Sequence, residues 1–179
     1  AGDINKDGYD DVLVGAQPFT DGQTNEGAVF LFLGSPSGLA ADPAWSFQSD
    51  QSAAQLGLVV TGGCDLNLDG YADAAVSAPY YDQGETDAGM VWVFLGGPAG
   101  LSGLPVWSTA GEQADARFGS ALSCAGDPDA NGYPDLLVGA RGYDTIVDGS
   151  LPVLDTGAAF LFYNTGGVLA PTAGWQAIG

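Results

Sequence analysis

Hydrophobic residues in this chain fall in short runs, not on one face of long helices. Runs such as Val12–Ala16 and Gly27–Leu33 are of strand length, rich in β-branched and aromatic side chains, and bounded by Gly, Pro, Asn and Asp. A helix would need apolar residues at a sustained 3.6-residue spacing, whereas short runs closed by turn residues are typical of strands. The pattern therefore predicts an all-β protein.

The same pattern occurs three times. Each copy has a polar loop, an apolar run ending in small residues, a second apolar run, a Gly/Pro turn, a Leu and a Trp. The polar loops begin at Asp3, Asp65 and Asp127, so each lies 62 residues after the one before. Self-similarity at a fixed period is typical of repeat architectures. We divide the 179-residue chain into repeats of residues 1–49, 50–111 and 112–179.

The repeats differ in two places. A run ahead of the polar loop is visible in repeats two and three, at residues 55–61 and 117–123, but has no counterpart in repeat one. Repeat three carries six extra residues within 143–156, because the spacing of the final Trp residues grows from 62 to 68. We expect four strands per repeat, with the inner strand of the first repeat missing.

These residues resemble the FG-GAP repeats of the integrin α-subunit propeller and its bacterial relatives. Phe118-Gly119 supplies the FG pair in repeat three, Leu56-Gly57 replaces it in repeat two, and Ser77-Ala78-Pro79 stands for the GAP triplet. No copy carries both halves unaltered, but the resemblance covers nearly the whole chain at matched spacing. It implies that each repeat is one four-stranded blade of a β-propeller.

Charge narrows the range of partners. The chain has 22 Asp and Glu residues against Lys6, Arg117 and Arg141, a formal net charge of −19. Nucleic acids and anionic membranes attract proteins mainly through Lys and Arg, so we expect neither as a partner. We also expect no membrane insertion, since no apolar run is long enough to span a bilayer. Cations are the partners that this charge favours.

Histidine is absent, which excludes Ser-His-Asp and Cys-His catalysis and His-ligated zinc. An enzyme would have to use carboxylates, as glycosidases with paired acids do. Most acids belong to the repeated loops, and the extra Asp10 of loop one corresponds to Ala72 and Pro134. We therefore interpret the chain as a binding module and not an enzyme. The alternatives are a carboxylate-dependent hydrolase, an accessory propeller of an enzyme, or a spacer in a surface protein.

The polar loops have the spacing of calcium ligands. Ca²⁺ takes six to eight oxygens from side chains, carbonyls and water. Positions 1, 3, 5 and 9 of each loop offer Asp or Asn oxygens, Gly at position 6 permits the turn, and the carbonyl at position 7 is the expected main-chain ligand. The predicted ligands of three calcium ions, one per repeat, are Asp3, Asn5, Asp7, Tyr9 and Asp11; Asp65, Asn67, Asp69, Tyr71 and Asp73; and Asp127, Asp129, Asn131, Tyr133 and Asp135.

Neither an EF-hand, nor a metal-free turn, nor a magnesium site fits these loops as well. An EF-hand closes with Glu at position 12 between two helices, but here position 12 is Val14, Val76 or Val138, inside predicted strands. Asp, Asn and Gly also build turns without a metal, yet three copies of alternating oxygen donors favour a cation. Mg²⁺ demands tighter octahedral geometry. The resemblance likewise implies calcium, in a structural role.

The resemblance also implies where a ligand binds. In integrins the face opposite the calcium loops binds ligand, which corresponds here to loops 17–26, 79–88 and 141–156. We expect a protein or glycan ligand, and weak calcium loops indicate a location where calcium is abundant: outside the cell, at its surface, or in the periplasm. The stretch 145–155 is unusually apolar, so it either contacts a partner or folds back as a local cap.

Two expectations concern how the repeats are held together. Closed propellers have about four to eight blades, so we expect flanking repeats in a longer chain, or head-to-tail association of several chains, to cover the apolar terminal faces. Cys64 and Cys124 occupy non-equivalent positions in their repeats. A disulfide is one option, but we interpret them as small, largely buried residues.

Overall fold

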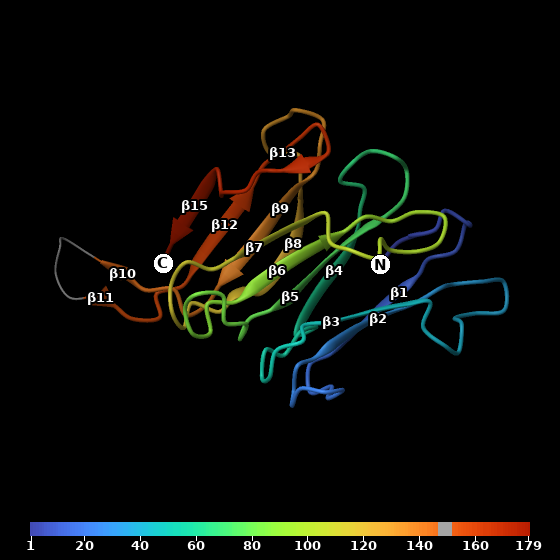
Figure 1. Ribbon diagram of the computed structural model, residues 1–179. Helices are drawn as coiled ribbons and strands as arrows, with labels where there is room; N and C mark the ends of the chain where they lie inside the picture. The colour runs from blue at the N-terminus through green and yellow to red at the C-terminus, as the bar shows by residue number, and fades with distance from the viewer. Residues whose placement is uncertain (147–151) are drawn as a thin grey trace.

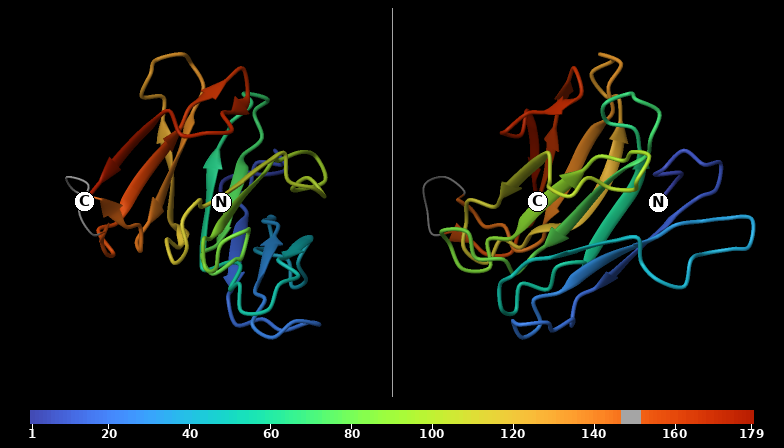
Figure 2. Two further views of the ribbon diagram at one scale, coloured as in Figure 1. Left: turned by 60° about the vertical axis from the view of Figure 1, so that its left-hand side comes forward. Right: turned by 45° about the vertical axis from the view of Figure 1, so that its right-hand side comes forward.

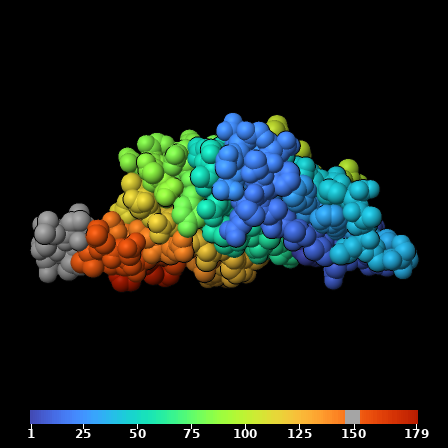
Figure 3. All heavy atoms as spheres, turned by 90° about the horizontal axis from the view of Figure 1, so that it is seen from below, coloured from blue at the N-terminus to red at the C-terminus, as the bar shows by residue number. Residues whose placement is uncertain are grey.

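A computed structural model describes residues 1–146 and 152–179 of the chain. In this part the chain forms three main antiparallel sheets and two short hairpins, and contains no helix long and apolar enough to cross a membrane. The sheets follow one another along an elongated molecule, each packed face to face against the next (Figures 1, 2 and 3). The prediction of an all-β fold is confirmed.

Each of the three main sheets is one β-propeller blade. Blade 1 contains β1 (Val12–Ala16), β2 (Ala28–Phe32) and β3 (Trp45–Gln48). Blade 2 contains β4 (Val59–Cys64), β5 (Asp73–Ala78), β6 (Met90–Phe94) and β7 (Trp107–Ala110). Blade 3 contains β8 (Phe118–Gly126), β9 (Asp135–Ala140), β12 (Ala158–Phe162) and β15 (Trp175–Ile178). The hairpins pair β10 (Thr145–Ile146) with β11 (Pro152–Val153), and β13 (Asn164–Thr165) with β14 (Val168–Leu169).

Blade 1 has three strands where the others have four, as predicted. Among the described residues, no fourth strand pairs with β1, which is therefore the edge of its sheet. The consequence shows at Val14, whose side chain is 42% exposed, whereas the equivalent Val76 and Val138 are fully buried. An unpaired apolar edge of this kind is a template for further strand pairing.

Two apolar cores lie between the blades, one between blades 1 and 2 and one between blades 2 and 3. Successive side chains of a strand point to opposite faces of its sheet. Accordingly, Trp92 and Phe94 of β6 pack into the first core, and Val91 and Val93 into the second. Both faces of the central blade are thus buried.

The final Trp of each repeat reaches towards the following blade. The indole Nε1 of Trp45 donates to the carbonyl of Ser102 at 3.1 Å, and that of Trp107 donates to the carbonyl of Ala170 at 3.0 Å. The third such residue, Trp175, is 48% exposed. The outer face of blade 3 therefore presents the same aromatic group without a following blade in the described residues.

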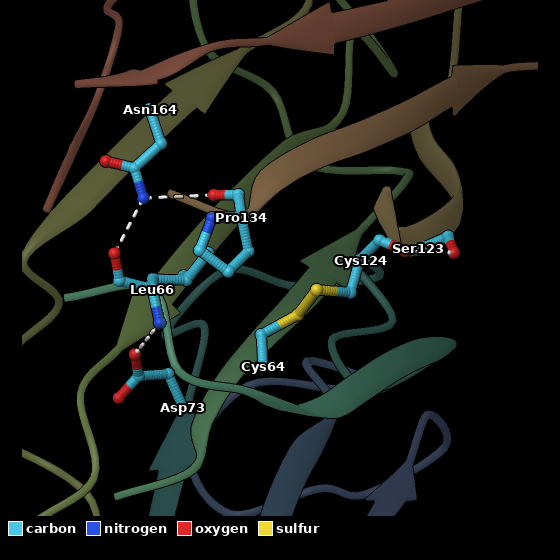
Figure 4. The surroundings of a disulfide bond; sticks show 7 residues. All are labelled: Cys64, Leu66, Asp73, Ser123, Cys124, Pro134 and Asn164. Atoms are coloured by element: carbon cyan, nitrogen blue, oxygen red, sulfur yellow. Dashed lines mark hydrogen bonds between the residues drawn. A yellow bond between two sulfur atoms is a disulfide. The ribbon is translucent and has the colours of Figure 1, made fainter. Parts of the chain in front are cut away.

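Of the two options for the cysteines, the structure shows the one that was not favoured, because Cys64 and Cys124 form a disulfide (Figure 4). Cys64 ends β4 and Cys124 lies in β8, the inner strands of adjacent blades, with their Cα atoms 6.2 Å apart. Their non-equivalent positions follow from this arrangement, since a crosslink between neighbouring blades joins residues that face one another, not residues that share a place in the repeat. The bond covalently joins blade 2 to blade 3.

The insert of repeat three includes the β10–β11 hairpin. Val153 of β11 and the following Leu154 are exposed. Val147 and Leu151 of the predicted apolar stretch lie outside the described residues. The contact between this stretch and a partner stays a prediction.

Candidate metal centres

The three polar loops lie at one end of the blades, and the loops 17–26 and 79–88, with residues 141–146 and 152–156 of the third loop, lie at the other (Figure 1). This arrangement follows from the antiparallel order of the strands, because successive connections alternate between the two ends of a sheet. The candidate ligands therefore gather on one side of the molecule, away from the loops in which the resemblance implies ligand binding.

Within each loop, the side chains of positions 1 and 3 converge on one amide. In the first loop, Oδ1 of Asp3 and Oδ1 of Asn5 both accept from the N–H of Asp7, at 3.0 and 3.1 Å. The same pairs of bonds recur at Asp69, at 3.0 and 3.2 Å, and at Asn131, at 3.0 and 3.2 Å. Each of these oxygens uses one acceptor site for the N–H and keeps further lone pairs for another ligand.

Position 5 completes the turn. Its side-chain oxygen accepts from the N–H of the Tyr at position 7: Asp7 from Tyr9 at 3.0 Å, Asp69 from Tyr71 at 2.9 Å, and Asn131 from Tyr133 at 2.9 Å. The glycine between them has a φ of 93°, 87° or 94° in the three loops, a conformation that residues with a Cβ rarely adopt. The turn that aligns these oxygens therefore depends on Gly at position 6.

Position 9, a predicted ligand, also holds the loop in place. Asp11 is buried, and its two carboxylate oxygens accept from the N–H groups of Ile4 and Gly34, both at 2.8 Å. Asp73 does the same with Leu66 at 2.7 Å and Gly96 at 2.8 Å. This carboxylate holds the loop against the turn that follows the second strand of its blade.

The third loop leaves one carboxylate oxygen of this position unpaired. Oδ1 of Asp135 accepts from the N–H of Asn164 at 2.8 Å, but its Oδ2 is buried and has no hydrogen-bond partner among the described residues. The cause lies in the sequence, because position 2 of this loop is Pro128, which has no N–H to donate. A buried carboxylate oxygen without a partner is costly, and it is an available ligand for a cation.

Asn164 has a role that the sequence analysis did not find. It occupies the place of Gly34 and Gly96, where a Cβ would approach main-chain atoms of neighbouring loops. Its Nδ2 donates to the carbonyl of Pro134 at 3.0 Å and to that of Leu66, in the loop of blade 2, at 2.7 Å (Figure 4). Asn164 therefore ties the third loop to the second.

Burial and like charges raise the pKa of Asp73 and of Asp135, the position-9 carboxylates of the second and third loops. Burial raises the pKa of Asp73 to about 6, although the N–H groups of Gly96 and Leu66 oppose the shift, and the charges of Asp69 and Asp65 raise it further. The pKa of Asp135 is raised in the same way, by burial first and by its acidic loop neighbours. A cation in the loop would favour the ionised form of both groups.

The oxygen atoms of the loops are of the kind that a hard cation binds, but they are not gathered around one point in advance. In residues 1–146 and 152–179, no three acidic or cysteine side chains are gathered into a group that could hold a metal ion. The structure brings positions 1 and 3 together on one N–H and buries the carboxylate at position 9. Carboxylate, amide and carbonyl oxygens with free lone pairs are nevertheless the ligands that Ca²⁺ prefers. Oδ2 of Asp135 is one such oxygen, and it is buried.

Comparison with known proteins points to one family. The model of the FG-GAP repeat matches residues 1–32 and 56–94. Integrin alpha-5 of Xenopus laevis is 34% identical over 169 residues, which are 89% of this chain and 16% of that protein. Integrin alpha-PS2 of Drosophila melanogaster is 36% identical over 159 residues (80% and 11%), and integrin alpha-V of Gallus gallus is 38% identical over 154 residues (81% and 14%). The chain thus spans only a small part of the length of these relatives.

Proposed function

Because the chain belongs to the FG-GAP repeat family, we propose that it is a calcium-binding, integrin-α-like propeller module that recognises a protein or glycan outside the cell. The observation that carries this proposal is the threefold recurrence of one loop, with the same donors and hydrogen bonds, at the same end of three successive blades. Calcium has a structural role in this account, and the module binds its ligand without catalysing a reaction.

Each ion would be held by one loop. The ligands are the side chains at positions 1, 3, 5 and 9 and the Tyr carbonyl at position 7, with three ions in all. The ion supplies positive charge to a loop that otherwise crowds three carboxylates together, such as Asp65, Asp69 and Asp73 in blade 2. The ion contributes to the stability of the fold and has no catalytic role.

The disulfide supports an extracellular location. Disulfides form and persist in oxidising environments such as the cell exterior and the periplasm, and are rare in the cytosol. The Cys64–Cys124 bond therefore agrees with the requirement of weak calcium loops for abundant calcium.

Ligand recognition is proposed for the end opposite the calcium loops. Tyr80 lies there beside two cations. The guanidinium groups of Arg117 and Arg141 are 5.5 and 5.9 Å from the centre of its ring, and Nη2 of Arg141 donates to its hydroxyl at 2.6 Å. Two of the three basic residues of a strongly acidic chain thus meet at one half-buried tyrosine. Arg and Tyr are the residue types that most often dominate binding interfaces.

We expect Arg141→Ala to weaken capture of a protein or glycan ligand by about tenfold, the effect of one interface hot spot. The matched control is Lys6→Ala, which removes the same charge from the calcium-loop end. Glycan and extracellular-protein arrays in calcium identify the ligand, and a hydrolysis assay on each captured glycan separates binding from catalysis. Turnover of a captured glycan would favour the hydrolase alternative instead.

A further blade is proposed as the partner of the exposed terminal faces. Ala40 of repeat one is equivalent to Ser102 and Ala170, because the N–H of each bonds the carbonyl at the end of the second strand, that of Leu33, Leu95 or Tyr163. A second copy, docked head to tail, would therefore offer the Ala40 carbonyl to the indole of Trp175. Flanking repeats in a longer chain would serve in the same way.

We expect the isolated chain to associate in calcium as concentration rises, with Trp175→Ala shifting it towards the monomer. The matched control is Leu104→Ala, which removes an exposed apolar side chain from a turn of blade 2. Light scattering over a concentration series measures the effect. A well-folded monomer at every concentration would contradict the association.

A further inference from the structure

A cavity of about 470 Å³ lies between blades 2 and 3. On one side it is lined by Thr109 of β7 and by Glu112 and Gln113, which follow that strand; on the other side it is lined by Phe118, Tyr143 and Phe160 of blade 3. Pockets that bind small organic molecules have volumes of about 300–1,000 Å³. The cavity is therefore of a size to hold a small ligand.

One difference between the repeats falls at this cavity. In blade 1, Phe47 pairs with Val29, and in blade 2 Thr109 pairs with the equivalent Val91, so Thr109 stands in the place of Phe47. The Phe47 ring packs edge-on against Trp92 and Phe94 of the next blade, with ring centres 5.6 and 4.9 Å away. Thr109 brings no ring to the equivalent place.

The rings that Phe47 would meet are still present in blade 3. Phe160 and Phe162 are the counterparts of Trp92 and Phe94, because they occupy the same positions in the strand pairing. Phe118 lies 5.7 and 5.9 Å from them, and Tyr143 lies 5.5 Å from Phe160, between ring centres. These rings form an aromatic wall, and edge-to-face packing against such a wall favours another aromatic ring.

The charge at the rim of the cavity decides which charge of ligand it favours. Among the described residues that line it, Glu112 carries the only charge at neutral pH. Gln113 is fixed in place, since its side chain donates to the carbonyl of Asp144 at 3.1 Å and accepts from the N–H of Asp144 at 2.6 Å. An aromatic wall with a carboxylate at its rim suits an organic cation and repels an anion.

We propose that this cavity binds a small aromatic amine. The ring takes the place that Phe47 fills in the preceding interface, against Phe160 and Phe162, and the ammonium group faces Glu112. This site is separate from the calcium loops, whereas Tyr143 of its wall belongs to the loop that begins at residue 141, at the end proposed for ligand recognition. The proposal rests on the cavity itself, so it neither requires nor supports the proposed function.

The test uses 2-phenylethylamine as the probe and 3-phenylpropanoate as its control, which pairs a ring with the opposite charge. Titration of the chain in calcium, followed by calorimetry or NMR, should give a Kd of about 1 mM or lower for the amine, a typical affinity for so small a ligand, and no measurable binding of the acid. Equal binding of the two probes, or no binding of the amine, would overturn the proposal.

Two substitutions locate the site. Thr109→Phe supplies the missing ring and should abolish amine binding, whereas Ser108→Phe adds the same ring at an exposed neighbouring position of β7 and should leave binding unchanged. Glu112→Gln leaves the core intact and should weaken amine binding by about threefold, the effect of one exposed ion pair, while leaving the binding of neutral toluene unaltered. Unchanged amine affinity in Glu112→Gln would overturn the proposal even if Thr109→Phe failed to fold.

Discussion

Replacement of both Cys64 and Cys124 by Ala is expected to lower the free energy of unfolding by about 4 kcal/mol. The disulfide joins residues separated by 60 positions in the sequence, and closure of so long a loop removes much of the conformational freedom of the unfolded chain. The bond also joins the inner strands of two blades, so its loss should affect the packing of blade 3 against blade 2.

Urea unfolding in excess calcium measures this effect. Ser123→Ala, which shortens an exposed side chain next to Cys124 on the same strand, is the control and should unfold at the midpoint of the unaltered chain. A double-alanine variant that unfolded at that same midpoint would show that the crosslink contributes nothing to stability.

Removal of calcium is expected to have an effect of similar size. A ligand that binds only the native state stabilises it by about 1.4 kcal/mol per site at ten times its Kd, which amounts to about 4 kcal/mol for three sites. Chelation should therefore lower the melting temperature, because each loop then holds three like charges without a counterion.

Asp69→Ala tests the contribution of a single loop. This substitution deletes the position-5 carboxylate of the second loop and should reduce the response to calcium by about one third, since two of three sites remain. Asp42→Ala removes one exposed acid outside the loops and should leave the response unchanged. Identical melting curves of the unaltered chain in excess calcium and in chelator would contradict the assignment of calcium to these loops.

The blades could be predicted from the sequence because they depend on local patterns. Short apolar runs bounded by turn residues recur at one period, and each run became a strand that pairs with its neighbour in the chain. The smaller number of strands in blade 1 followed from the same alignment. Such features require no knowledge of how one blade sits on the next.

The parts that sequence reasoning missed depend on contacts between distant residues. Asp11 was predicted as a ligand from the spacing of its loop, but its hydrogen bond from the N–H of Gly34, 23 residues further along, could not be predicted in that way. Asn164 acts on Leu66, 98 residues away and in another blade. A signal was nevertheless present, since an apolar residue at position 2 of the loop and a Gly after the second strand recur in repeats one and two.

The disulfide and the cavity were hidden for a related reason. Both lie between blades 2 and 3, and the alignment of repeats compares equivalent positions, whereas an interface joins non-equivalent ones. The contrast between Phe47 and Thr109 is visible in the sequence, but only the strand pairing shows that both residues face the following blade. The contacts between blades, and not the blades themselves, were beyond prediction.

The most direct test of the calcium assignment is an anomalous difference map from crystals grown in calcium. We predict three peaks, one in each of the loops 3–11, 65–73 and 127–135, with side-chain and carbonyl oxygens about 2.3–2.6 Å away. Well-ordered loops without peaks, at calcium concentrations that occupy weak extracellular sites, would contradict the account and would leave the loops as polar turns held by their own hydrogen bonds.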